Sequence, residues 1–322
     1  MDFILAALGL VILLLAGDSL VRGAVNVSLR LGVPALLVSL TIVAFGTSAP
    51  ELLISIKAVL QNSPGIALGN VVGSNTANIL LVLGIPAIIS GLATSRSAPI
   101  KSYLTMLGAS VLFIGVCFIG PITWVHGLVM LAVLAAILVD QGREALAHRR
   151  NGTANDAAEG DDGDDDLEGA DPDMPWWKIL VFLGLGLVGL PLGADLLVDS
   201  SINIARAIGV SETAIGLTLV AIGTSLPELA TTVMAAIRRQ ADVALGNVIG
   251  SNMFNLMGII GVASLFGAIA VPPEFLRFDL WVMLGVSVLI APFVFSRSLD
   301  MTRLWGVAFI AIYAVYLWLV VA

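Results

Sequence analysis

The chain consists of long apolar stretches separated by short polar turns. Each stretch is long enough for a helix that crosses a bilayer, which needs about 20 mostly apolar residues. We predict ten such helices, divided by one polar interval into two groups of five. Their approximate bounds are 3–30, 34–60, 66–92, 99–119 and 122–140 before the interval, and 175–208, 211–237, 243–270, 277–296 and 302–321 after it. The pattern predicts an all-α integral membrane protein.

The polar interval, residues 141–174, is rich in Gly, Ala and Asp and has hardly any apolar residue in its centre. Such a composition cannot bury enough surface to offset the entropy of the chain, so we expect a disordered linker. It separates a first five-helix unit, residues 1–140, from a second one, residues 175–322.

The composition excludes a water-soluble enzyme, because 58% of the residues are hydrophobic, only 12% are charged and the mean hydropathy is +1.03. The formal net charge of −8 is confined to one segment. Ten acidic residues lie between Asp156 and Asp173, which leaves 15 basic and 13 acidic residues, a net of +2, in the rest of the chain. The acidity therefore belongs to the linker.

The distribution of Lys and Arg predicts the orientation in the membrane. Twelve of them fall in loops on the side of the linker and three on the other side. Positive residues concentrate on the cytoplasmic side, so we expect a cytoplasmic linker and both termini outside, in an inner (plasma) membrane.

The two units are copies of one repeat. A shift of 177 residues superimposes 40–51 on 217–228 and 67–78 on 244–255, and 20 of the 39 positions between 40 and 78 are identical. Because each unit holds an odd number of spans, the second copy must be inverted relative to the first. Inverted repeats with broken helices at the midplane are typical of transporters that work by alternating access.

Two acidic residues, Glu51 and Glu228, occupy matched positions in the middle of apolar spans. A charged side chain at that depth costs about 2.5–3.5 kcal/mol on insertion scales, and no Lys or Arg at comparable depth could neutralise either acid. We therefore interpret both glutamates as functional. By contrast, Asp18 and its repeat partner Asp195 lie within or near the ends of their spans, where we expect polar bridging or interfacial exposure rather than ion binding.

A proline directly precedes each of these glutamates and is expected to break the helix. The break frees main-chain carbonyls, which are tolerated at membrane depth only where they line protein or a polar cavity, and which are good ligands for hard cations. Four further residues lie around the two breaks: Ala44, Thr47, Ala221 and Thr224.

Hydroxyl and amide side chains complete an oxygen-only site. Thr47 and Ser48 share a helix face with Glu51. The next span carries Ser74 and Asn78 four residues apart, and its copy carries Ser251 and Asn255. Such ligands favour Ca²⁺, Na⁺ or Mn²⁺ over zinc or copper. Two buried negative charges are costly without cations, which favours exchange over leak.

The motif Gly-Thr-Ser-x-Pro-Glu followed by Gly-Asn-x-x-Gly-Ser-Asn-x-x-Asn, present twice, resembles the α-repeats of the Ca²⁺/cation antiporter superfamily, in its prokaryotic sodium/calcium exchanger branch. The resemblance implies that Glu51 and Glu228 bind Ca²⁺ and Na⁺ by turns, that Thr47 and Thr224 give backbone oxygens to Ca²⁺, and that Asn78 lies near the centre. The residues implied to help form flanking Na⁺ sites are Ala44, Ser48, Ser74, Ala221, Ser225 and Ser251.

One position departs from the archaeal pattern, in which the last residue of the second motif is Asp; here it is Asn255. A carboxamide is the neutral counterpart of a protonated Asp. The departure leaves both Na⁺ stoichiometry and the choice between Na⁺ and H⁺ as coupling ion open.

The sequence thus predicts a secondary-active antiporter that extrudes cytoplasmic Ca²⁺ in exchange for Na⁺. Alternatives are H⁺-coupled or K⁺-dependent exchange of Ca²⁺ or another divalent cation and, from another class, a Ca²⁺-permeable channel. The chain lacks an HExxH motif, a Ser/His pairing and a nucleophile elbow, so we expect no enzyme activity. We expect no cofactor and no nucleic-acid partner; the partners are the transported ions and the bilayer.

Overall fold

The computed structural model describes residues 1–322 apart from 95–98, 151–170, 172, 208–220, 297 and 322. Within the described ranges the chain is helical, and its strand-like pairings are two isolated bridges, Leu92 with Met301 and Ile122 with Ile269. Eight described helices are long and apolar enough to cross a membrane, and a bent pair of helices makes up to nine. The prediction of an all-α membrane protein is confirmed.

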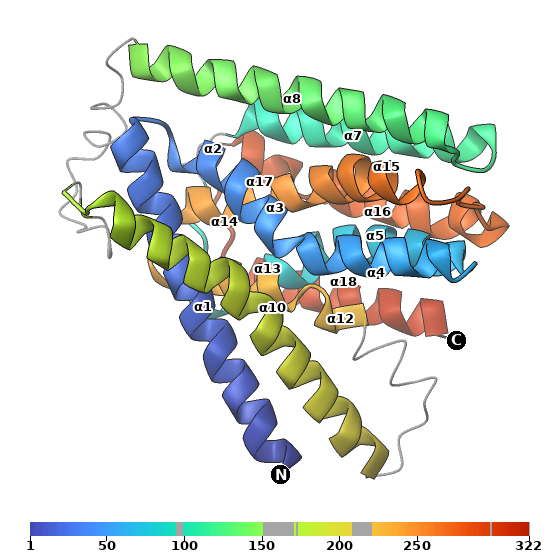
Figure 1. Cartoon of the computed structure of the whole chain (residues 1–322), viewed down its shortest axis with the longest axis horizontal. Helices are drawn as coiled ribbons and strands as arrows, with labels where there is room; N and C mark the ends of the chain where they lie inside the picture. Colours follow the sequence, from blue (N-terminus) through green and yellow to red (C-terminus); the bar gives the residue numbers. More distant parts are fainter. Residues whose placement is uncertain (95–98, 151–170, 172, 208–220, 297, 322) are drawn as a thin grey trace.

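The first unit begins with a long helix and continues through a broken span and a central span that is also interrupted (Figure 1). Its elements are α1 (Asp2–Leu31), α2 (Ala35–Val38), the π-helical η1 (Ser39–Val43), α3 (Ala44–Thr47), α4 (Ala49–Leu60), α5 (Pro64–Ala77), the π-helical η2 (Asn78–Val82), α6 (Gly84–Ile89), α7 (Ile100–Ile119) and α8 (Trp124–Arg150).

The second unit follows the same order. Its elements are α10 (Trp176–Ala207), α12 (Ala221–Gly223), α13 (Leu226–Ile237), α14 (Ala241–Met253), the π-helical η4 (Phe254–Ile259), α15 (Ile260–Ala263), the π-helical η5 (Phe275–Asp279), α16 (Leu280–Leu289), α17 (Ala291–Phe295) and α18 (Arg303–Val321). The predicted span 211–237 lies partly outside the described residues, so its second half is what the structure describes, as α12 and α13.

One boundary of the linker was wrong. Helix α8 continues to Arg150 instead of ending at residue 140. The residues after 140 include Arg143, Glu144 and Leu146, which are good helix formers, so the helix can extend into water beyond the apolar stretch. The centre of the predicted linker, residues 151–170, lies outside the described residues.

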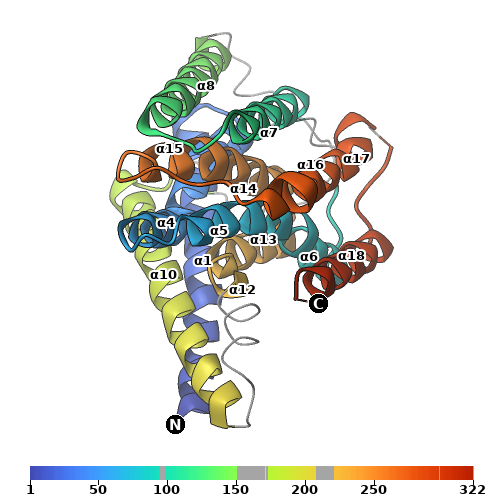
Figure 2. The same ribbon diagram turned by 90° about the vertical axis from the view of Figure 1, so that its right-hand side faces the viewer.

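The centre of the bundle is formed by the two motif-bearing spans. Ninety-four per cent of the apolar window in Ala241–Ala263 is buried, and 72% of that in Pro64–Ile89, against 17% in Arg303–Val320 at the periphery. In Figure 2, α5, α13 and α14 lie in the interior, and α8 and α18 lie at opposite edges. Glycines permit close contact, because a Cβ at Gly246 would lie 2.9 Å from the carbonyl oxygen of Leu36.

Helices α1 and α10 lie side by side and run obliquely to the rest of the bundle (Figures 1 and 2). Their backbones touch through small residues. A Cβ at Gly9 would lie 2.7 Å from the backbone nitrogen of Leu197, and one at Gly193 would lie 2.9 Å from that of Leu13. These two helices therefore form a closely packed pair across the two units, as small residues permit in membrane helices.

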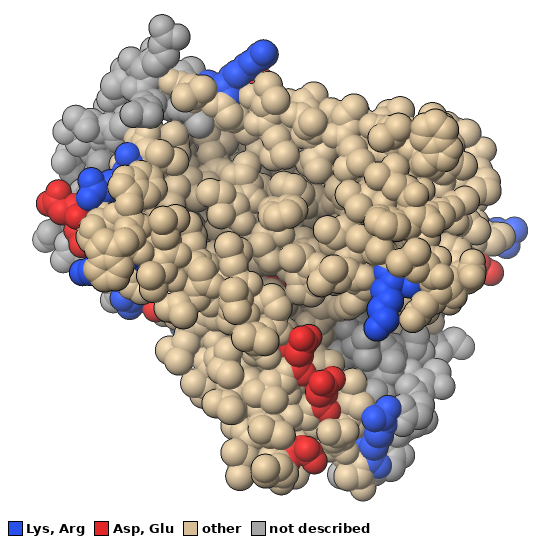
Figure 3. All heavy atoms as spheres, viewed as in Figure 1, with Lys and Arg blue, Asp and Glu red and all other residues tan. Residues whose placement is uncertain are grey.

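The face of the molecule in Figure 3 consists mostly of uncharged residues, with Lys, Arg, Asp and Glu gathered toward its ends and its lower part. Large apolar side chains such as Leu8, Leu128, Leu185 and Val315 are exposed on α1, α8, α10 and α18. Such a surface suits contact with lipid rather than with water.

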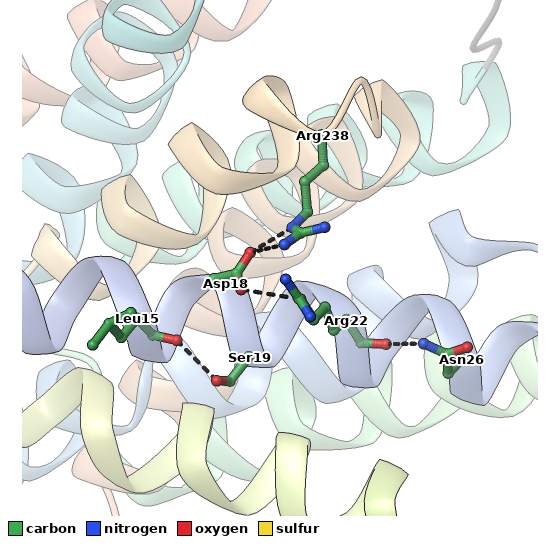
Figure 4. Close-up of polar contacts among 6 residues, drawn as sticks. All are labelled: Leu15, Asp18, Ser19, Arg22, Asn26 and Arg238. Carbon is green, nitrogen blue, oxygen red and sulfur yellow. Dashed lines mark hydrogen bonds and ion pairs between the residues drawn. The ribbon is translucent and has the colours of Figure 1, made fainter. Parts of the chain in front are cut away.

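Asp18 on α1 binds two arginines, as Figure 4 shows. Arg238, directly after the end of α13, contacts Asp18 through Nε and a terminal nitrogen. Arg22, one turn along α1, lies 3.0 Å from the other carboxylate oxygen. Only 9% of the Arg238 side chain is exposed. The expected polar bridge is present at Asp18, and it ties α1 to the helix that carries Glu228.

This ion pair should contribute measurably to stability. Removing one partner of a largely buried ion pair is costly, because the other charge loses its compensation. We expect Asp18→Asn and Arg238→Gln each to lower the thermal unfolding midpoint in detergent. The double variant should be less destabilised than the sum of the two, with a coupling of about 1–3 kcal/mol. The Arg22 side chain is 39% exposed, so Arg22→Gln should have little effect on the unfolding midpoint. Additive effects of Asp18→Asn and Arg238→Gln would contradict this assignment.

Candidate functional site

Both broken spans break at the same serine of the motif. Ser48 separates α3 from α4 with φ −82° and ψ 4°, and Ser225 precedes α13 with φ −89° and ψ 6°. The axes of the two helical parts in the first unit differ by 44°. Pro50 and Pro227 each follow two residues later, at the start of the new helix, where the missing N–H of proline costs nothing.

The breaks carry the two glutamates into the first turns of α4 and α13, where both are completely buried. Neither oxygen of Glu51 has a hydrogen-bond partner among the described residues, nor does Oε2 of Glu228. The described ion pairs leave both glutamates out. The site thus places two carboxyl groups in the protein interior without a basic partner among the described residues.

Hydroxyl groups of the two units meet at these carboxylates. Ser48 donates to Oε1 of Glu228 over 3.2 Å, and the hydroxyls of Thr47 and Ser251 lie 3.4 Å apart. All of these side chains are buried. Residues that are 180 and 204 positions apart in the sequence are therefore neighbours, and the site is built from both units.

The two predicted asparagines, Asn78 and Asn255, lie at the beginning of two π-helical segments. Asn78 begins η2, and Asn255 is the second residue of η4. Asn78 donates to Oδ1 of Asn252 over 3.0 Å, whereas its Oδ1, like Nδ2 and Oδ1 of Asn255, has no partner within the described part of the chain. π-helical turns in α-helices are frequent at functional sites, because they turn a side chain out of the regular spacing.

The remaining predicted residues differ in their environments. The carbonyl of Ala44 accepts bonds from the Ser48 amide and the Thr47 hydroxyl, and the Ser74 hydroxyl donates to the carbonyl of Asn70 in its own helix. Ser225 is buried and its hydroxyl has no partner among the described residues. Thr224 is half-buried, and for Ala221 the structure describes only the backbone, in α12.

Four asparagines of the motif were not predicted as site residues, although the structure gives them direct roles around it. Asn70 and Asn247 bond to the helices of the glutamates. Asn75 and Asn252 exchange bonds across the two units, each amide donating to the carbonyl of the other residue over 3.2 and 3.4 Å. The sequence could have indicated these residues, because Asn stands at the same positions in both copies of the repeat.

The chemistry of the cluster is that of a hard-cation site. The described residues contain no group of three or more His, Cys, Asp and Glu side chains that could hold a metal ion. The Glu228 carboxylate is contacted by a neutral hydroxyl, that of Ser48. Such oxygens suit Ca²⁺ and Na⁺. Two carboxylates would balance the charge of one divalent ion.

The profile of a family described as "Sodium/calcium exchanger protein" matches residues 1–141 and 178–322. The sodium/calcium exchanger MaX1 of Methanosarcina acetivorans is 33% identical over 98% of this chain and 97% of its own length. The uncharacterized membrane protein MJ0091 of Methanocaldococcus jannaschii is 35% identical over 96% of this chain and 94% of its own.

A solved structure of the sodium-calcium exchanger NCX_Mj, soaked with 2.5 mM Na⁺ and 0.1 mM Ca²⁺, superimposes with a TM-score of 0.77. It is 31% identical, and the match covers 98% of this chain and 96% of that one. The similarity thus extends over both units and both motifs, as the repeat and the buried acidic pair had indicated. The chain therefore belongs to the sodium/calcium exchanger family of integral membrane antiporters, which are transporters and not enzymes.

Proposed function

We propose that this protein extrudes cytoplasmic Ca²⁺ by exchange for Na⁺. The observation that carries the proposal is the buried pair Glu51 and Glu228, with three carboxylate oxygens that have no partner among the described residues. Charges buried in this way are costly unless a counter-charge joins them. A cation that enters the site supplies that counter-charge.

The same two carboxylates would serve both substrates by turns. One Ca²⁺ neutralises both, and Na⁺ would need at least two ions to do so. Neutral oxygens around them, including the Ser225 hydroxyl and the Asn78 and Asn255 amides, are buried and able to contribute further ligands. Because the empty site is electrostatically unfavourable, the protein changes sides loaded, and transport of one ion becomes coupled to counter-transport of the other.

Alternating access follows from an inverted repeat with the ion site between its copies. In this scheme the pair α1 and α10 slides past the central helices and exposes the site to either side in turn. The small-residue contacts between α1 and α10 let this pair move as one body. We further propose that both termini lie outside and the linker lies in the cytoplasm, on the basis of the Lys and Arg count.

The test is ⁴⁵Ca²⁺ flux into proteoliposomes that contain the purified protein, with a Na⁺, K⁺ or pH gradient imposed singly. We expect Ca²⁺ uptake when Na⁺ is loaded inside, and none when the interior holds only choline at the same pH. Protein-free liposomes under the same gradients are the control.

Two outcomes would contradict Na⁺/Ca²⁺ exchange and establish another function. Uptake driven by a pH or K⁺ gradient, but not by Na⁺, would establish an H⁺-coupled or K⁺-dependent exchanger. This is the second candidate, because the neutral Asn255 stands where the archaeal pattern has Asp. Ca²⁺ flux that persists with no counter-ion on the opposite side would establish a channel, since an exchanger moves Ca²⁺ only against another ion.

A further inference from the structure

Two asparagines hold the glutamate helices in the same way in both units. Nδ2 of Asn70 on α5 donates to the carbonyl of Glu51 over 3.1 Å and to the hydroxyl of Ser55 over 3.0 Å. Nδ2 of Asn247 on α14 donates to the carbonyl of Glu228 over 3.3 Å and to the hydroxyl of Thr232 over 3.1 Å. Each amide thus bonds to two points one turn apart on the glutamate helix, the glutamate carbonyl and the hydroxyl of the residue four positions later.

These bonds act next to the helix breaks. Each glutamate lies in the first turn of its helix, directly after the break at Ser48 or Ser225. A side-chain donor from the neighbouring helix adds a constraint at this turn. It fixes the glutamate backbone both along and around the helix axis.

Asn247 also reaches the other unit. Its Oδ1 accepts a bond from the Thr47 hydroxyl over 3.3 Å, while both hydrogens of its Nδ2 have acceptors on α13. One completely buried side chain therefore links the helix of Glu228 to the break beside Glu51. Both Nδ2 hydrogens and the Oδ1 of Asn247 thus have partners within the protein, and these partners orient the amide.

The asparagines of the motif differ in the partners of their amides. Asn75, Asn78 and Asn255 each keep a buried Oδ1 that has no partner among the described residues. The Nδ2 groups of Asn70 and Asn247 instead bond to the helices that carry the glutamates. Asn70 and Asn247 are therefore placed to hold the glutamates in position.

We propose that Asn70 and Asn247 are positioning residues that set the locations of the Glu51 and Glu228 carboxylates relative to each other, and so determine the affinity for Ca²⁺. The proposal rests on the function proposed above, in which these carboxylates bind the ion. A divalent ion shared by two carboxylates is sensitive to their separation, because its ligand oxygens must lie 2.3–2.6 Å away.

The experiment measures the half-saturating Ca²⁺ concentration and the maximal rate in proteoliposomes, and Ca²⁺-induced thermal stabilisation of the protein in detergent. For Asn247→Ala we expect the half-saturating concentration to rise about tenfold, with a smaller change in maximal rate per folded molecule. Thr232→Val, which removes one acceptor and keeps the shape, should shift it in the same direction by about threefold, and Thr232→Ser should restore it. Asn70→Ala and Ser55→Ala are the corresponding variants of the first unit.

The matched control is Ser39→Ala. Ser39 is completely buried and donates to the carbonyl of Val243 on α14 over 2.6 Å, so its removal costs α14 a buried bond without touching a glutamate helix. It should lower the unfolding midpoint and leave the half-saturating concentration unchanged. If Asn247→Ala and Thr232→Val behave as Ser39→Ala does, the asparagines are merely structural and the proposal is wrong.

The two Thr232 variants keep the test decisive even where Asn247→Ala does not fold. Failure of the proposed function gives a different result, because the unmodified protein would then show no Na⁺-driven Ca²⁺ uptake. A wild-type protein that binds Ca²⁺, combined with variants of unchanged affinity, overturns the positioning role alone.

Discussion

Glu51→Gln and Glu228→Gln are each expected to abolish Na⁺-driven ⁴⁵Ca²⁺ uptake in proteoliposomes. Glutamine keeps the size of the side chain and one oxygen but removes the charge. A site with a single carboxylate leaves one charge of Ca²⁺ uncompensated in the interior, where that charge costs several kcal/mol. A loss of about 3 kcal/mol in binding lowers affinity by more than 100-fold.

The same substitutions should not impair folding. Both glutamates are completely buried, and the described ion pairs leave both out. Replacing one buried carboxyl group by a neutral amide removes the cost of burying its charge, and we expect the unfolding midpoint without Ca²⁺ to stay equal or rise. The stabilisation that Ca²⁺ gives the wild-type protein should be lost. Wild-type exchange in either variant would refute the assignment of the site.

Gly250→Leu is expected to disrupt the centre of the molecule. A Cβ at Gly250 would lie 2.6 Å from the carbonyl oxygen of Leu40 and 2.6 Å from the Cβ of Ala44. Both contacts belong to the broken span, and a backbone oxygen cannot move aside as a flexible side chain can. Overpacking in a core typically costs 1–3 kcal/mol, and a clash with backbone costs more. We expect a strongly lowered unfolding midpoint and loss of ⁴⁵Ca²⁺ exchange.

Gly115→Leu provides the comparison. Gly115 lies in the middle of α7, is exposed on the helix surface, and has nothing within 4 Å of the position of an added Cβ. The same change of residue should leave the midpoint and the exchange rate near those of the wild type. Equal effects of the two substitutions would mean that the close contact at Gly250 is not what the site requires.

The sequence predicted those features that follow from a conflict with the membrane environment. Glu51 and Glu228 were identified because a carboxylate is costly in an apolar span, and the breaks at Ser48 and Ser225 because proline cannot continue a helix. These constraints are local, so they can be recognised without knowledge of the neighbours.

The features that escaped prediction depend on partners far away in the chain. Asp18 was expected to form a polar bridge, but its partner Arg238 lies 220 residues away, and only the fold brings them together. The roles of Asn70 and Asn78 differ although both belong to one motif, because one faces a glutamate helix and the other faces Asn252. The end of α8 at Arg150 was missed because hydropathy marks where apolar residues end and not where helix ends.

The reciprocal bonds between Asn75 and Asn252 have a consequence for the motion. These residues are related by the shift of 177 positions, and each donates to the carbonyl of the other, so the pair is unchanged when the two units exchange roles. Asn75 lies on α5 and Asn252 on α14, so the pair joins the two central helices directly. In the proposed scheme, in which α1 and α10 slide past the central helices, these bonds can stay intact in both states.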